Sequence, residues 1–119
     1  MKKDPKIFLS HISESIKEIE KNTTNLKEDE FYRNTTIQDA VVRRLEIIGE
    51  ATKNLPESFR KKHPEVEWRK VAGLRDIIAH EYFGLSLKLI WKIVQNNIPE
   101  LKKQISKILG SLEKSANFV

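Results

Sequence analysis

Apolar residues recur three and four positions apart along this chain, the spacing that places them on one face of an α-helix. The pattern predicts five helices, at roughly 5–22, from 35 or 36 to 54, from 67 to Gly84, from Ser86 through Val94, and from Pro99 through Leu112. A short acidic turn is predicted at 27–33, and a polar loop between Pro56 and Pro64. We therefore expect an all-α fold, an up-and-down bundle of about five helices, with residues 1–119 forming one domain.

Capping residues mark several of these helix ends. Thr35 or Thr36 is the predicted N-cap of the second helix, and Ser86 is the predicted N-cap of the fourth. Pro99 fits the first turn of the last helix, where its missing N–H group costs nothing. Each of these residues therefore predicts where a helix begins.

Gly49 and Gly73 both fall inside helical patterns, where each costs about 1 kcal/mol relative to alanine. One explanation is close approach of another backbone, from a neighbouring helix, a second subunit or a ligand. The other is ordinary tight packing between helices. The sequence leaves both explanations open.

Composition excludes several kinds of chemistry. The chain has no cysteine, which rules out disulfides, thiolate metal sites and a cysteine nucleophile. Its three histidines are scattered without the spacing of a zinc site, so we expect no bound metal. No apolar run has the length of a signal peptide or a membrane span, so we expect a cytoplasmic protein without a membrane partner.

The chain is basic, with 22 lysine and arginine residues against 17 acidic residues and a formal net charge of +5. Charges of both signs balance within residues 1–34, so the excess lies in 35–119. Basic clusters occur at 43–44, 60–63 and 69–70. Such a surface attracts polyanions, above all RNA, but charge alone favours a solvated helical surface in which the two signs alternate.

The most informative segment is Arg75-Asp76-Ile77-Ile78-Ala79-His80-Glu81-Tyr82, an Arg-x4-His-x-Tyr pattern. A guanidinium binds phosphate oxygens in pairs, and an imidazole exchanges protons near neutral pH. These groups predict metal-free RNA cleavage without a cofactor: His80 takes the proton of a ribose 2′-hydroxyl, and Arg75 stabilises the charge on the phosphorane. A 2′,3′-cyclic phosphate would result, with Tyr82 bonding a phosphate or orienting a base.

Each of these residues also has an ordinary explanation. A histidine at a helix end is commonly a cap or a packing residue, and a tyrosine beside an apolar stripe is commonly part of the core. Arg75 is expected to form a surface ion pair, with Asp76 or Glu50 as its partner. The three residues at this spacing form a more specific signal than any one of them.

Helical geometry separates the catalytic candidates. At about 100° per residue, Tyr82 falls near Arg75, whereas His80 falls about 140° around the helix. Val71, Leu74 and Ile78 form the predicted core stripe. One straight helix would not aim Arg75 and His80 at a single small substrate. The helix either loosens before Gly84, or a second copy of the chain completes the site in a two-fold dimer, which we favour.

The pattern resembles that of HepT-like toxins in the HEPN superfamily, and the resemblance covers nearly the whole chain. The resembling segments are Arg44–Ala51, Trp68, Gly73–Asp76, His80–Phe83, Trp91 and Ile98–Leu101. The resemblance implies a helical homodimer, metal-independent ribonuclease activity through Arg75 and His80, and an RNA substrate. It also implies a type VII-like toxin–antitoxin pair, in which an MNT-type nucleotidyltransferase antitoxin adenylylates Tyr82. An AMP group there would add bulk and negative charge to the RNA-binding groove.

Two other functions remain open. The chain is alternatively a non-catalytic partner that binds a nucleotidyltransferase and presents a nucleotide or Tyr82 to it. A weaker alternative is a helical nucleic-acid-binding protein, although no helix-turn-helix pattern is clear. Its aromatic residues, such as Trp68 and Trp91, fall where core packing explains them.

Overall fold

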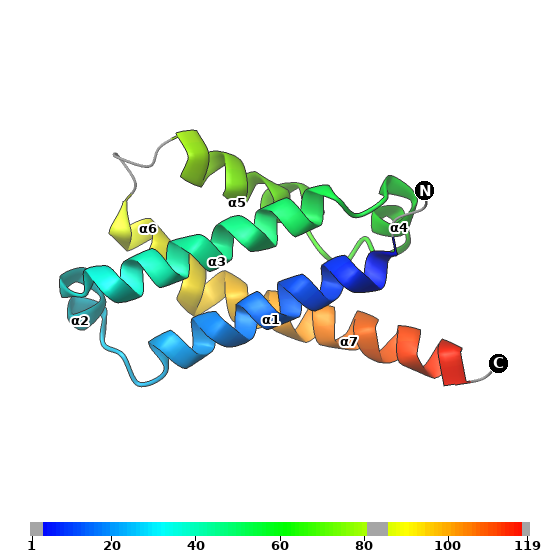
Figure 1. The fold of residues 1–119 in the computed structure, drawn as a ribbon, viewed down its shortest axis with the longest axis horizontal. Helices are drawn as coiled ribbons and strands as arrows, with labels where there is room; N and C mark the ends of the chain where they lie inside the picture. Colours follow the sequence, from blue (N-terminus) through cyan, green and yellow to red (C-terminus); the bar gives the residue numbers. More distant parts are fainter. Residues whose placement is uncertain (1–3, 81–85, 118–119) are drawn as a thin grey trace.

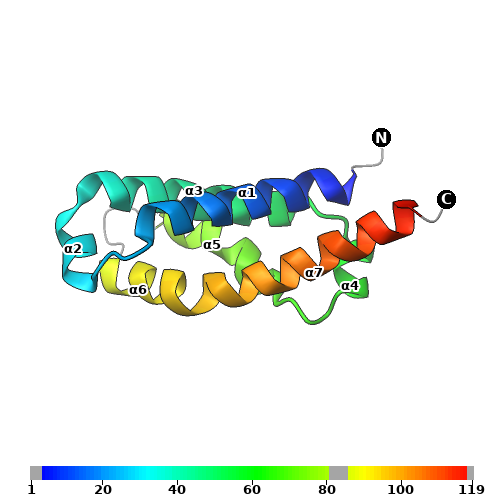
Figure 2. The same cartoon turned by 90° about the horizontal axis from the view of Figure 1, so that it is seen from below.

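The computed structural model describes residues 4–80 and 86–117, with side chains for 4–78 and 86–114 (Figure 1). All regular structure in these ranges is helical: α1 (Pro5–Thr23), α2 (Glu28–Arg33), α3 (Thr35–Lys53), α4 (Glu57–Lys62), α5 (Trp68–His80), α6 (Leu87–Lys92), the π-helical turn η2 (Ile93–Asn97) and α7 (Ile98–Asn117). The long segments α1, α3, α5 and the run from α6 to α7 alternate in direction (Figures 1 and 2). The predicted all-α up-and-down bundle is therefore confirmed.

Two short helices replace segments that the periodicity predicted to be a turn and a loop. α2 lies where the acidic turn was expected, and α4 lies in the expected polar loop. Each has six residues and buries one aromatic side chain: Phe31 is 0% exposed and Phe59 is 9% exposed. A six-residue helix is too short to show a repeating apolar pattern, which explains why the prediction was wrong.

Side-chain caps fix several helix starts. Asp4 accepts a hydrogen bond from the Lys6 N–H at 2.9 Å, with Pro5 in the first turn of α1. Ser86 accepts one from the Leu89 N–H at 3.2 Å, which confirms the predicted cap of α6. The predicted cap of α3 was wrong by one or two residues. Asn34 caps it, because its side-chain oxygen accepts the Ile37 N–H at 3.0 Å.

The C-terminal helices are joined rather than separated. α6 runs through the π-helical turn η2 directly into α7 (Figure 2). Within η2 the Ile98 N–H bonds to the Ile93 carbonyl, five residues back. Pro99 is the second residue of α7, which confirms its place in the first turn. A proline ring clashes with the carbonyl four residues earlier in a regular helix, so the wider turn lets the helix pass it without a break.

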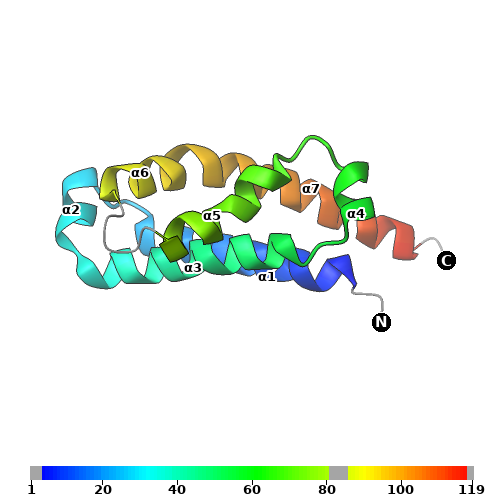
Figure 3. The same cartoon turned by 90° about the horizontal axis from the view of Figure 1, so that it is seen from above.

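α3 is the central helix of the bundle. It packs on α1 along one side and on α5 along the other, while α7 packs on α1 (Figures 1 and 3). The apolar core between these helices is aliphatic, apart from Phe31, Phe59 and Trp68. Ile78 of the predicted α5 stripe is buried, and Val71 and Leu74 pack against the core while partly exposed. No helix in the described ranges combines the length and apolarity needed to cross a membrane.

Candidate active site

Arg75 lies where α5 crosses α3, and Gly49 is the residue it meets. A Cβ atom at position 49 would lie 2.6 Å from the Arg75 backbone nitrogen and 2.7 Å from its Cβ. No side chain fits at that distance without moving one of the helices. Of the explanations for this glycine, the structure supports close approach by a neighbouring helix. For Gly73, no described atom beyond its own stretch of helix lies within 4 Å of such a Cβ, so no described neighbouring helix explains that glycine.

Ion pairs hold the Arg75 side chain on the surface of α3. Its Nε lies 3.1 Å from Oε2 of Glu50, and its Nη1 lies 4.0 Å from Oδ1 of Asp76. Both predicted partners are therefore confirmed, with Glu50 the closer. The Arg75 side chain is 43% exposed and that of Glu50 57% exposed, so the pair is solvated and contributes little to stability. Its effect is to restrict where the guanidinium can lie.

Lys53 is a fourth charged group in this cluster, and sequence reasoning missed it. Its Nζ donates to Oδ1 of Asp76 at 2.6 Å. The signal was present, because Lys53 follows Glu50 by three residues and so shares its face of α3. With two cations and two carboxylates, the Arg75 cluster (Glu50, Lys53, Arg75 and Asp76) has no formal net charge. Asp76 therefore lies between two cations instead of acting as an isolated acid beside Arg75.

The rest of the predicted catalytic pattern is not placed. α5 is helical through His80, but the side chain of His80 lies outside the described residues. Tyr82 and Gly84 also lie outside them. The roles of His80 and Tyr82, and the completion of the site by a second copy, therefore stay predictions. Among the described residues, no three His, Asp or Glu side chains gather as metal ligands.

A polar groove begins at Arg75 and crosses the exposed side of α3 to reach α1. It has a volume of about 300 Å³. Its polar lining includes His11 from α1, Arg43, Glu46 and Glu50 from α3, and Arg75 from α5. Of these, sequence reasoning named only Arg75 and Glu50 as site residues. The spacing of 43, 46 and 50 places the α3 residues on one helical face, but only the fold brings His11 beside them.

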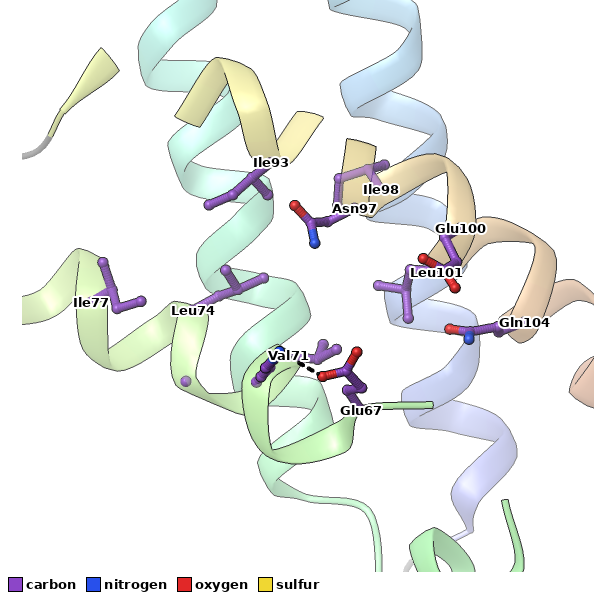
Figure 4. Close-up of a pocket in the computed structure, with 12 residues that line it drawn as sticks. Glu67, Val71, Leu74, Ile77, Ile93, Asn97, Ile98, Glu100, Leu101 and Gln104 are labelled. Atoms are coloured by element: carbon purple, nitrogen blue, oxygen red, sulfur yellow. Dashed lines mark ion pairs between the residues drawn. The ribbon is translucent and has the colours of Figure 1, made fainter. Parts of the chain in front are cut away.

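A second groove separates α5 from the C-terminal helices and is mainly apolar, with a volume of about 410 Å³. Figure 4 shows Val71, Leu74 and Ile77 of α5 on one side, and Ile93 and Leu101 on the other. Ile77 is 39% exposed, which is high for an isoleucine.

One ion pair lies at the edge of this groove. The Lys70 ammonium lies 2.8 Å from the Glu67 carboxylate. This hydrogen bond and the charge of Glu67 raise the pKa of Lys70 above its ordinary value. Lys70 therefore keeps its charge beyond the pH at which a free lysine loses it.

Comparison with known proteins identifies a family that this chain matches. The family model for ribonuclease HepT-like proteins matches residues 12–108. Over 117 residues the chain is 50% identical to a Methanocaldococcus jannaschii protein named a gamma-glutamylcyclotransferase and candidate RNase. That match covers 98% of this chain and 53% of the relative, so the chain spans about half of that protein.

Other relatives are matched over almost their full length. A second Methanocaldococcus jannaschii protein, named a candidate RNase, is 46% identical over 94% of this chain and 93% of its own length. A Thermococcus cleftensis protein named probable ribonuclease HepT is 43% identical over 91% of this chain and 98% of its own length. No solved structure matches the chain at a significant level.

Proposed function

Because this chain belongs to the ribonuclease HepT-like family, we propose that it is a metal-independent RNA endonuclease that needs no cofactor. Arg75 and His80 are the proposed catalytic residues, and Glu50 and Asp76 support Arg75. The observation that carries the proposal is the position of Arg75. Glu50 holds its guanidinium at 3.1 Å, beside a groove of about 300 Å³ that a nucleotide can enter.

In the proposed reaction, His80 takes the proton of a ribose 2′-hydroxyl as the 2′-oxygen attacks phosphorus. The bond between phosphorus and the 5′-oxygen breaks, and the leaving oxygen takes a proton from water. Arg75 binds the phosphate oxygens and stabilises the negative charge that builds up on them. The products are a 2′,3′-cyclic phosphate and a 5′-hydroxyl end.

The test is digestion of RNA in EDTA. We expect cleavage by the wild type, and a rate lower by roughly a hundredfold or more in His80→Ala and in Arg75→Ala, because each removes a group acting in the transition state. Arg33→Ala is the matched control, since Arg33 forms a solvated ion pair with Asp29 on α2. Full activity in His80→Ala would remove that residue from the mechanism. A need for added metal would contradict the metal-independent reaction.

We propose that the chain is the toxin of a type VII-like toxin–antitoxin pair in the cytoplasm. Its antitoxin is an MNT-type nucleotidyltransferase that transfers AMP to Tyr82, two residues beyond His80. The adduct brings negative charge to a site that must receive RNA phosphates. Incubation with the nucleotidyltransferase and ATP should add the mass of one AMP to the wild type and none to Tyr82→Phe. The modified protein should no longer cleave RNA.

We propose that a second copy covers the apolar groove between α5 and α7. The support is the exposed Ile77 and the apolar lining of this groove (Figure 4). Ile77→Glu should convert a dimer into a monomer in light scattering, because a charge would be buried at the contact. Ile7→Glu is the control, as Ile7 is 53% exposed on α1, away from the groove. A monomeric wild type at micromolar concentration would refute the dimer.

One observation favours the alternative, a non-catalytic partner of a nucleotidyltransferase. The Arg75 cluster has no formal net charge, which attracts RNA less than an unpaired arginine would. A pull-down with the nucleotidyltransferase, combined with the RNA digestion, separates the two functions. Binding without cleavage by an unmodified wild type would favour the alternative.

A further inference from the structure

We propose that the polar groove over α3 binds a nucleotide base, and that it receives the base next to the phosphate held by Arg75. The position of this base relative to the cleaved bond rests on the proposed ribonuclease function. The binding of a base does not, because it follows from the groove itself. α3 lies between α1 and α5 (Figure 1). Residues of α3 form the floor of the groove, and side chains from the two flanking helices form its walls.

The groove has a size that suits one nucleotide. Its volume of about 300 Å³ lies at the lower end of the range for small-ligand pockets. Three helices contribute to its lining, so the fold positions the side chains relative to one another. A ligand there would touch Arg75 on one wall and α1 on the other.

Aromatic rings form the α1 wall. Phe8 and His11 lie one helical turn apart, with ring centroids 6.3 Å apart and planes at 89°. His11 is exposed, whereas Phe8 is partly buried and packs against the core. Proteins that bind single-stranded RNA stack its bases on such rings, which every base accepts through its flat face.

The polar groups of the groove suit a base with hydrogen-bond donors better than a bare anion. Arg43 pairs with Glu46 at 3.6 Å, and Arg75 pairs with Glu50 at 3.1 Å, so each cation of the groove has a carboxylate beside it. The formal charges of these two pairs cancel, so a second phosphate gains little there. A carboxylate instead accepts the N–H groups of a base edge or the hydroxyl groups of a ribose.

The pair of Arg43 and Glu46 is loose enough to give way to a ligand. The Arg43 side chain is 70% exposed, that of Glu46 is 42% exposed, and their separation exceeds that of a good hydrogen bond. Opening this pair frees a carboxylate beside the aromatic wall. Guanine presents two adjacent N–H donors on its Watson–Crick edge, which match the two oxygens of a carboxylate. A guanine nucleotide is therefore the best probe.

Titration of the protein with guanosine 5′-monophosphate, followed by amide NMR spectra, tests base binding without requiring RNA cleavage. Ribose 5-phosphate is the matched ligand without a base. We expect the nucleotide to shift amides of α1 near His11 and of α3 near Glu46, and to bind roughly tenfold more tightly than ribose 5-phosphate. Equal binding of the two ligands, or shifts confined to residues around Arg75, would overturn the proposal, since only phosphate would then be recognised.

Variants locate the base within the groove. His11→Ala should weaken nucleotide binding roughly fivefold and leave ribose 5-phosphate binding unchanged. Ser10→Ala is the control, because Ser10 is exposed on α1 and does not line the groove. Unchanged nucleotide binding in both His11→Ala and Glu46→Gln would refute the assigned walls.

RNA cleavage then separates this inference from the proposed function. If the wild type cleaves RNA, His11→Ala should raise KM and alter the base next to the cut, with kcat nearly unchanged. If the wild type binds the nucleotide but cleaves no RNA, the ribonuclease function fails while the base site stands. Cleavage with KM and cut sites unchanged in His11→Ala would overturn the base site and leave the ribonuclease function intact.

Discussion

Replacing Gly49 with alanine tests the helix crossing that positions Arg75. At an ordinary helical position this change stabilises a protein by about 1 kcal/mol, because alanine is the better helix former. At Gly49 the new Cβ would lie 2.6 Å from the Arg75 backbone nitrogen, well inside van der Waals contact. The obstructing atoms are backbone and Cβ atoms of α5, which cannot rotate away. The helices must therefore separate.

The size of the effect follows from a comparison with Gly110 inside α7, where a Cβ would meet no described atom within 4 Å beyond its own stretch of helix. Gly110→Ala should gain about 1 kcal/mol. Overpacking costs about 1–3 kcal/mol, so Gly49→Ala should be less stable than Gly110→Ala by about that amount. The helix-propensity term is common to both variants and cancels in this difference.

Urea unfolding followed by circular dichroism measures both free energies, and the RNA digestion reports the consequence for the site. We expect Gly49→Ala to unfold at lower urea than Gly110→Ala and to lose cleavage under conditions where it remains folded, because Arg75 moves with α5. Gly73→Ala provides a second comparison within α5, where a Cβ likewise meets no described atom within 4 Å outside the local helix. Equal stability of the Gly49 and Gly110 variants would refute the close crossing.

Three further predictions concern other side chains. Ser15 is 0% exposed and its hydroxyl has no hydrogen-bond partner among the described residues. In urea unfolding, Ser15→Ala should therefore stabilise the protein by about 1 kcal/mol more than the control Ser13→Ala does. An equal gain in the two variants would show that the Ser15 hydroxyl has a hydrogen-bond partner. The hydrogen bond from Tyr32 to Glu28 raises the pKa of the phenol above its ordinary value of 10.0, so its stabilising effect is present below that pH and is lost as pH rises through the raised pKa. Glu28→Gln should lower this pKa in an ultraviolet titration corrected with Tyr32→Phe, and an unchanged pKa would contradict the bond. Glu50→Gln should change the free energy of unfolding by less than about 1 kcal/mol but slow RNA cleavage several-fold. The reason is that this exposed ion pair orients Arg75 more than it stabilises the fold. An unchanged cleavage rate would remove Glu50 from the site.

The sequence predicted the fold class because α1, α3, α5 and α7 each repeat apolar residues over several turns. It did not predict α2 and α4, whose six residues are too few for a period to appear. The sequence predicted that a helix begins near Pro99, but it did not predict the π-helical turn that precedes this residue. That turn depends on packing as well as on the proline.

At the candidate site, sequence reasoning predicted only part of the Arg75 cluster and of the groove beside it. Glu50 and Asp76 were expected as partners of Arg75, since a surface arginine commonly pairs with an acid, although only Asp76 is its neighbour in sequence. Lys53 and His11 were missed. Their relation to Arg75 depends on how α3 packs against α5 and α1, which one-dimensional spacing does not specify.

The attachment of α5 chiefly to α3 has a consequence for local stability. The opposite side of α5 lines an open groove, so this helix has fewer neighbours to hold it than α1 or α3 has. Segments with few buried contacts open at lower free energy than the whole protein. Amide hydrogens of α5 should therefore exchange with deuterium sooner than those of α3, and any ligand or partner that covers the groove should slow that exchange. The order of the helix that carries Arg75 is thus open to control by binding in the groove.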